Sequence, residues 1–129
     1  NDVSAAVGRA NLNEADIILS AFKSNADYYN DKLENVDGVT LIPQLGTPAY
    51  WLYTMHVERR DDFMKYMSEK GIATSRVHER NDKHTCTSRF SINLPGVDKA
   101  VSTMVSIPVG FWVNEEDRKY IVDIIKKGW

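Results

Sequence analysis

The 129-residue sequence has little cysteine: Cys86 is the only one, so no disulfide can form within the chain. This usage is typical of a reducing compartment, and we expect a cytoplasmic protein. No apolar run approaches the roughly 20 residues that a membrane-spanning helix needs. The first residues also lack the basic and apolar regions of a signal peptide. We therefore expect no membrane association.

The sequence also lacks an excess of charge of either sign. Sixteen basic residues oppose eighteen acidic ones, which gives a formal net charge of −2 at pH 7. Nucleic-acid binding draws most of its affinity from a basic surface, so this balance argues against a nucleic-acid partner. The aromatic run Tyr50–Tyr53 could stack on bases, but the charge balance favours a place in the core. Glycine-rich phosphate loops of the GxxxxGKS/T and GxGxxG types are absent as well.

Two helices carry the clearest periodicity. Residues 3–35 are predicted to form one long helix, because apolar residues recur at steps of three and four. These are Ile18, Phe22, Ala26, Tyr29 and Leu33. Residues 114–128 are predicted to form the last helix. Asn114 can cap its start, three acidic residues fill its first turn, and two lysines precede its end at Gly128.

Between these helices the pattern predicts short strands at 39–42, 50–57, 72–78 and 105–110, with helices near 61–70 and 94–104. Both faces of Tyr50–Val57 are largely apolar, which indicates a central strand covered on both sides. Pro108 indicates an edge for the last strand. We therefore predict an α+β fold, in which a small, mostly antiparallel sheet packs against helices and follows a long N-terminal helix.

The stretch "ATSRVHERNDKHTC" at 73–86 concentrates chemically active side chains. His78, His84 and Cys86 have the right atoms for zinc, but their spacing matches none of the usual ligand arrangements. Cys86 with His84 could form a nucleophile pair, but no orienting group accompanies it. We therefore interpret the stretch as a polar loop with no metal. Residues 78–89 still combine donors and acceptors suited to an anion or a sugar, and no complete active site is evident.

Four phrases in this order resemble a known family. They are "NDVSAAVGRANL" (Asn1–Leu12), "YWLYTMHVERRDDFMKYMSEKGIATSRVH" (Tyr50–His78), "LPGVDKAVSTMVSIPV" (Leu94–Val109) and "VNEEDRKYIVDIIKKG" (Val113–Gly128). Together they are similar to the C-terminal part of DegT/StrS-type nucleotide-sugar aminotransferases, in the aspartate-aminotransferase fold superfamily. The resemblance covers essentially the whole chain.

This resemblance implies an enzyme that uses pyridoxal 5′-phosphate. Family members move an amino group, usually from glutamate, to a nucleotide-linked keto-sugar in polysaccharide, lipopolysaccharide or antibiotic amino-sugar synthesis, and they form homodimers. Their Schiff-base lysine precedes the region that matches this chain. Residues 1–129 are thus expected to be a single small domain, with the large cofactor-binding domain upstream. We expect this piece alone neither to bind the cofactor nor to catalyse.

The same resemblance points to substrate-binding residues. Many relatives read "HYxP" where this chain reads His78-Glu79-Arg80-Asn81, in a region that borders the active site and contacts the sugar. His78 carries over by position, and Glu79 and Arg80 would alter the sugar preference. Alternatively, His78 only ends a strand. A second hypothesis for the whole chain is a free-standing, non-catalytic α+β module that binds a partner or small molecule through residues 78–89.

Overall fold

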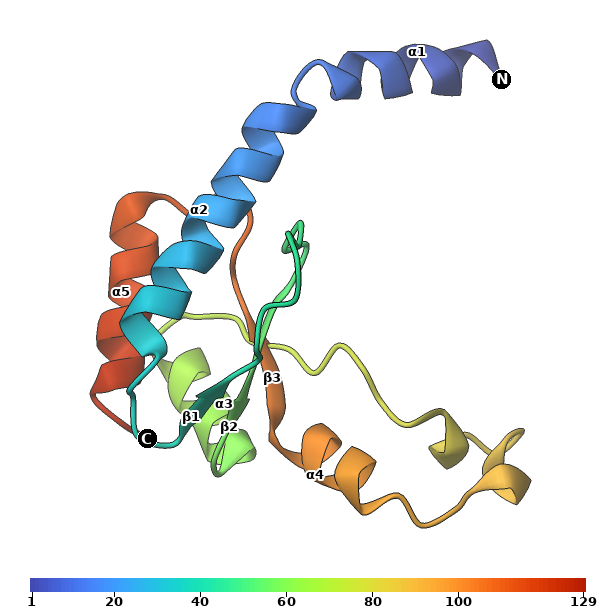
Figure 1. Ribbon diagram of the computed structural model, residues 1–129, viewed down its shortest axis with the longest axis vertical. Coiled ribbons are helices and arrows are strands. Elements are labelled where there is room, and N and C mark those ends of the chain that lie inside the picture. Colours follow the sequence, from blue (N-terminus) through green and yellow to red (C-terminus); the bar gives the residue numbers. More distant parts are fainter.

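The computed structural model describes all residues from 1 to 129 (Figure 1). The helices are α1 (Asp2–Leu12), α2 (Ala15–Leu33), α3 (Arg60–Glu69), α4 (Pro95–Thr103) and α5 (Glu115–Lys126). The strands are β1 (Val39–Leu41), β2 (Tyr53–Val57) and β3 (Met104–Ile107), and the short 3-10 turns are η1 (Asn81–Lys83) and η2 (Ser88–Phe90). The predicted α+β class is confirmed.

The sheet has the order β1-β2-β3, and both pairs are antiparallel. Leu41 lies opposite Met55, and Met55 lies opposite Val105, so β2 is the central strand as predicted. It is shorter than predicted, because it begins only at Tyr53. Tyr50 has a φ of 52°, a left-handed conformation that ends extended pairing before the strand starts.

The predicted strand at 72–78 is wrong. Only Ser75 pairs, through an isolated bridge in which it exchanges two backbone hydrogen bonds with Ser106 on β3, at 3.1 and 2.9 Å. Ile72 is buried, but the side chains from Arg76 to Glu79 are exposed. The alternating pattern suits a strand, yet the chain leaves the edge of the sheet after one contact. Extended backbone without a neighbouring strand forms no inter-strand hydrogen bonds, so no strand develops.

The predicted long N-terminal helix is interrupted. The backbone N–H groups of Asn13 and Glu14 donate to the carbonyls of Ala10 and Asn11, at 3.2 and 3.1 Å. Such bonds across three residues tighten the last turn of a helix. The axis therefore changes direction between α1 and α2 (Figure 1). No residue of α1 is buried, and α1 projects from the body of the molecule.

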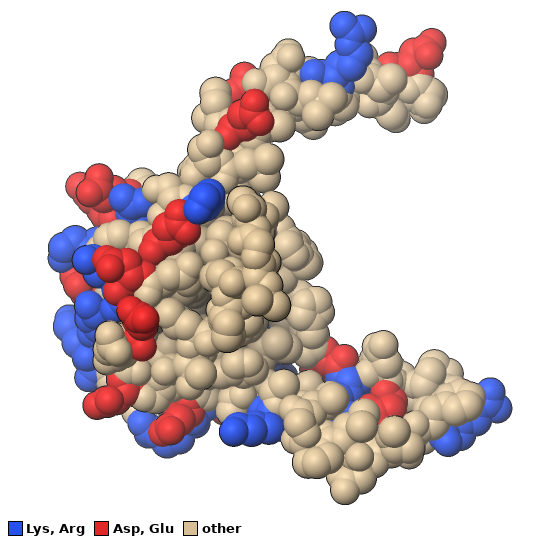
Figure 2. Space-filling view, in the orientation of Figure 1, with Lys and Arg blue, Asp and Glu red and all other residues tan.

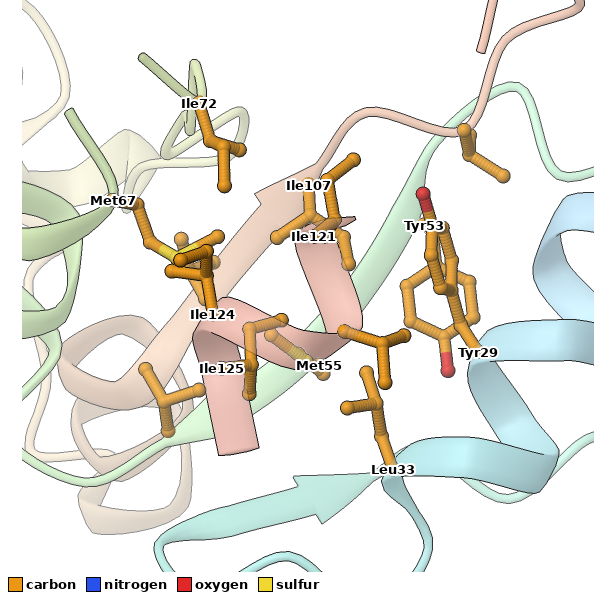
Figure 3. Close-up of a cluster of buried hydrophobic side chains, with 14 of the residues drawn as sticks. Tyr29, Leu33, Tyr53, Met55, Met67, Ile72, Ile107, Ile121, Ile124 and Ile125 are labelled. Carbon is orange, nitrogen blue, oxygen red and sulfur yellow. The ribbon is translucent and has the colours of Figure 1, made fainter. Parts of the chain in front are cut away.

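The core lies on one face of the sheet, where the side chains of Tyr53, Met55 and Val57 are buried. Helices α2, α3 and α5 supply most of the other core side chains (Figure 3). The predicted cap of α5 is confirmed: the Asn114 side chain accepts from the backbone N–H of Asp117, and the Asp117 carboxylate accepts from that of Asn114. Burial of this face supplies the main driving force for folding.

The opposite face of the sheet is polar, which corrects the expectation that β2 is covered by apolar groups on both sides. Thr54 and His56 are only half-buried. The Thr54 and Ser106 hydroxyls lie 2.9 Å apart, and His56 Nδ1 lies 2.8 Å from Thr103 Oγ1 of α4. Hydroxyl and imidazole groups satisfy one another there. Helix α4 therefore attaches to the sheet by hydrogen bonds, and none of its own residues is buried.

Candidate functional site

Two segments project from the same side of the molecule and leave a concave face between them (Figure 1). One is α1, and the other is residues 76–94, which we call the arm. Figure 2 shows that the body surface facing this space carries almost no charged atoms, whereas charges crowd the opposite side. The segments that border the space expose large apolar side chains, among them Val7, Trp51 and Phe90. Such a surface is typical of one that is covered by protein.

Arg80 occupies the interior of the arm, and its side chain is only 6% exposed. Its Nε donates to Asp82 Oδ1 at 2.7 Å, and its Nη1 donates to Asp98 Oδ1 at 2.5 Å. Its Nη2 donates to Asp82 Oδ2 and, at 3.1 Å, to the carbonyl of Ile92. The sequence predicted that Arg80 would donate to a substrate. In the structure its donors are instead used within the chain.

The ion pairs of this cluster shift the pKa values of Arg80 and Asp82. The hydrogen bond from Arg80, together with one from Ser91 Oγ at 2.9 Å, lowers the pKa of Asp82 to about 2 although partial burial opposes the shift. The two carboxylates raise the pKa of Arg80 above its ordinary value. Bidentate pairing of a guanidinium with a carboxylate favours both charged forms. Arg80 and Asp82 thus remain ionised throughout the physiological pH range.

His78 and Glu79 lie at the start of the arm, directly before Arg80. Both side chains are exposed, and neither makes a hydrogen bond or an ion pair within the chain. An imidazole and a carboxylate that are free of internal partners can bind a ligand from solution. Of the three predicted substrate-binding residues, two are therefore available and the third holds the segment that carries them.

The remaining candidates of the arm, His84 and Cys86, are exposed. The structure contains no group of three or more His, Cys, Asp or Glu side chains arranged to hold a metal ion. No hydrogen bond joins His84 to Cys86, so the geometry of an activated thiol is not present there.

No helix combines the length and apolar composition needed to cross a membrane.

A polar groove that the sequence did not predict lies between α4 and the strands β1 and β2. Its volume is about 450 Å³, and Thr40, His56, Glu58, Lys99 and Thr103 are among its lining residues. Asp98, the second anchor of Arg80, was also missed. The signal for an internal ion pair was present in Arg80 and Asp82, two positions apart, but nothing in the sequence connects Asp98 to them.

A lysine that holds a cofactor aldehyde must lie in an enclosed site. Every lysine of the chain is exposed. The hydrogen bonds of Lys23 to Asp27 and of Lys119 to Asp123 raise the pKa of both amines, which favours the protonated form. A Schiff-base lysine needs the opposite, a lowered pKa in an enclosed site. The exposed lysines of this chain therefore do not fit a pyridoxal phosphate site.

Comparison with known proteins places this geometry in context. A model of the DegT/DnrJ/EryC1/StrS aminotransferase family matches residues 1–126. The sugar aminotransferase CalS13 from Micromonospora echinospora is 39% identical, with a TM-score of 0.96 over 100% of this chain and 36% of that one. AtS13 from Actinomadura melliaura is 36% identical, with a TM-score of 0.95 over 99% of this chain and 35% of that one.

A curated relative is the erythromycin biosynthesis sensory transduction protein EryC1 from Saccharopolyspora erythraea. It is 23% identical over 136 residues, which cover 99% of this chain and 37% of the relative. The chain therefore spans little more than a third of the length of the relatives it matches.

Proposed function

The chain belongs to the DegT/DnrJ/EryC1/StrS aminotransferase family, and from that premise we propose that residues 1–129 form the C-terminal small domain of a pyridoxal-phosphate-dependent sugar aminotransferase. The single observation that carries this proposal is the continuous match of the whole chain to one part of a sugar aminotransferase, with closely similar structure. The concave, nearly uncharged face supports it, because we expect the rest of the enzyme to cover that surface.

We propose that the complete enzyme moves an amino group, with glutamate as the donor, to a keto-sugar carried on a nucleotide. This reaction belongs to polysaccharide, lipopolysaccharide or antibiotic amino-sugar synthesis. Pyridoxal phosphate supplies the electron sink for such a transfer. Because no lysine of this chain fits the cofactor, we assign the cofactor-binding lysine to another part of the enzyme. Residues 1–129 alone should be inactive, and the enzyme should be a cytoplasmic homodimer.

Within this domain we assign substrate contact to His78 and Glu79. Both side chains are exposed and free of internal partners, and both belong to the first residues of the arm. A sugar presents hydroxyl and carbonyl groups, which an imidazole and a carboxylate can recognise by hydrogen bonds. The replacement of the usual aromatic residue by Glu79 would favour a sugar that offers a hydrogen-bond donor at that place.

The test uses the full-length enzyme with glutamate and a nucleotide-linked keto-sugar. Replacement of His78 by alanine should raise the KM for the sugar or lower its turnover, and the half-reaction with glutamate should be unchanged. His84→Ala is the matched control, because His84 is an exposed histidine of the same arm. Identical sugar kinetics in wild type and His78→Ala would contradict the assignment of His78.

A second candidate is a non-catalytic α+β module that binds a small molecule. The observation that favours it is the polar groove beneath α4. Amination of a sugar by the full-length protein would decide for the enzyme. Absence of amination with a range of nucleotide-linked keto-sugars, together with saturable binding of a small molecule in the groove, would decide for the module.

A further inference from the structure

Arg80 contacts a near neighbour in the sequence, Asp82, and two more distant points, Ile92 and Asp98. Asp82 lies at the start of the arm, the carbonyl of Ile92 lies near its end, and Asp98 belongs to α4. The contact with Asp98 spans 18 residues and that with Ile92 spans 12. One guanidinium thus closes the arm into a loop whose two ends are held together.

Apart from the contacts of Arg80, the arm is shaped by short-range hydrogen bonds, among them those from Thr87 to the Asn81 carbonyl and from Ser91 to Asp82. Arg80 is the only buried residue between positions 76 and 94. The regular structure of the arm is limited to η1 and η2, of three residues each. Ordering a backbone costs about 1–2 kcal/mol per residue, and apolar burial does not offset that cost in this segment. The hydrogen bond of Arg80 to Asp98 is the only side-chain hydrogen bond that joins the arm to the rest of the chain, so we expect the contacts of Arg80 to restrain its position most.

Helix α4, which carries Asp98, is itself bonded to the rest of the domain. Arg60 of α3 donates through Nη1 to the carbonyl of Val101 in α4, and His56 of β2 bonds Thr103 in the same helix. A continuous series of contacts thus runs from the sheet to α4, from Asp98 of α4 to Arg80, and along the backbone to His78. His78 is thus tied to the body on both sides, by the bridge of Ser75 to Ser106 before it and by the contacts of Arg80 after it.

Arginine is required at this position for a geometric reason. Its planar fork offers five N–H donors, and here it contacts both oxygens of Asp82, one oxygen of Asp98 and a backbone carbonyl at once. Lysine carries the same charge, but as a single point with three rotatable donors. A lysine could keep one ion pair and would lose the simultaneous closure of both ends.

We propose that Arg80 is a positioning residue: it contacts no substrate itself and fixes the arm so that His78 and Glu79 meet the sugar. This inference rests on the proposed function. It replaces the expectation that Arg80 binds the substrate directly. A displacement of about 1 Å at a binding group can cost up to roughly a hundredfold in rate, so the loss of this restraint should be visible in kinetics.

The experiment uses the full-length enzyme and measures its two half-reactions separately. Arg80→Ala and Arg80→Lys should each raise the KM for the nucleotide-linked keto-sugar by roughly tenfold or more. The half-reaction with glutamate should stay within about twofold, which also shows that each variant is folded. Asp98→Asn should produce a smaller increase of the same kind. The control is Arg89→Ala, which removes an exposed arginine of the same arm that stacks on Phe90.

A second measurement distinguishes positioning from direct contact. Brief trypsin treatment should cleave the arm after Lys83 or Arg89 at least several-fold faster in Arg80→Ala than in wild type, because the restraint is lost. A raised KM with unchanged cleavage would mean direct substrate contact and would overturn the proposal. Faster cleavage with unchanged sugar kinetics would mean a purely structural role and would overturn it as well.

Failure of the proposed function would look different. In that case the wild-type enzyme would aminate no nucleotide-linked sugar, and the proposed role of Arg80 toward such a substrate would also be contradicted. The proteolysis result would still decide whether Arg80 restrains the arm.

Discussion

The side-chain amide of Asn25 donates a hydrogen bond of 3.0 Å to the carbonyl of Val113, which lies 88 residues later in the chain. The same nitrogen lies 3.1 Å from the carbonyl of Gly110 and 3.3 Å from that of Val109. One buried amide of α2 therefore satisfies the turn that connects β3 to α5. Without it, several carbonyls in that turn would be buried without a donor.

Asn25→Ala should lower the free energy of unfolding by about 2–4 kcal/mol, because unpaired carbonyls are costly in a buried site. Urea unfolding at pH 7 measures this value. Asn11→Ala is the control, because Asn11 is an exposed helical asparagine in α1 and should change stability by less than about 0.5 kcal/mol. Equal stability of the two variants would show that the turn does not depend on Asn25.

Gly110→Ala should displace the indole of Trp112. A Cβ at position 110 would lie 2.3 Å from a ring carbon of Trp112, closer than atoms can approach. The ring packs edge-on against Phe22, with centroids 6.1 Å apart, and contacts Phe111. Because Trp112 is largely exposed, its ring can move outward. The expected loss is about 1 kcal/mol, that of an aromatic contact, with a shift in tryptophan fluorescence.

Gly8→Ala provides the matched comparison for this substitution. No atom lies within 4 Å of a Cβ at Gly8, which is in the interior of α1. Alanine should there favour the helix by about 0.5–1 kcal/mol, and circular dichroism should show equal or higher helicity. A lower helicity in this variant would contradict the described open surface around α1.

Stability should fall as the pH rises above 10, because burial raises the pKa of the Tyr29 and Tyr53 hydroxyls above their ordinary value. In the unfolded chain these groups ionise near pH 10. Above that pH the unfolded state releases protons that the folded state keeps, so the folded state loses up to about 1.4 kcal/mol per pH unit for each group.

Urea unfolding between pH 9 and 11.5 measures this slope. The double variant Tyr29→Phe/Tyr53→Phe should flatten it, and its stability at pH 7 should also decrease. The decrease has a defined cause: the variant removes hydrogen bonds of 2.8 Å to the Pro108 carbonyl and to Asn30 Oδ1. A slope that is unaltered by the double substitution would rule these hydroxyls out as its origin.

The carboxyl group of Asp82 should titrate near pH 2, as its lowered pKa requires. Carbon-detected NMR of the side chain measures this value. In Arg80→Ala the pKa should rise toward about 3.9, that of a free aspartate, and in Ser91→Ala it should rise less. Because the folded pKa lies below the unfolded one, the contribution of this pair is complete above about pH 4 and is lost as the pH falls toward 2.

Local patterns in the sequence predicted much of the fold. The capping residues around Asn114 act within four positions of the chain, and the apolar pattern of Tyr53, Met55 and Val57 requires only one buried face. The segment after Ile72 carries an equally good alternation, yet only Ser75 finds a partner. Whether a segment forms a strand depends on the neighbour with which it pairs. The sequence does not show how many residues of β3 are free to pair with this segment.

The candidate site was predictable only in part, for the same reason. The composition of residues 78–89 indicated recognition of a polar ligand, but it did not distinguish side chains that face solvent from those used internally. Arg80 is buried because Asp98 and the Ile92 carbonyl come to it through the path of the arm. Such pairing follows from tertiary structure and cannot be predicted from local sequence. The positive φ of Tyr50 before β2 was not predictable from the sequence either.

None of the 18 side chains that form the hydrophobic core comes from the stretch between Ala73 and Met104. The arm and α4 can therefore change in sequence without a change in what drives the domain to fold. Mutations in this stretch should carry little risk of unfolding the domain, provided that an arginine and its two acids keep the loop closed. If the proposed function holds, substrate specificity can change in this stretch while the hydrophobic core stays the same, and a chimera that carries this stretch from a relative should retain its melting temperature.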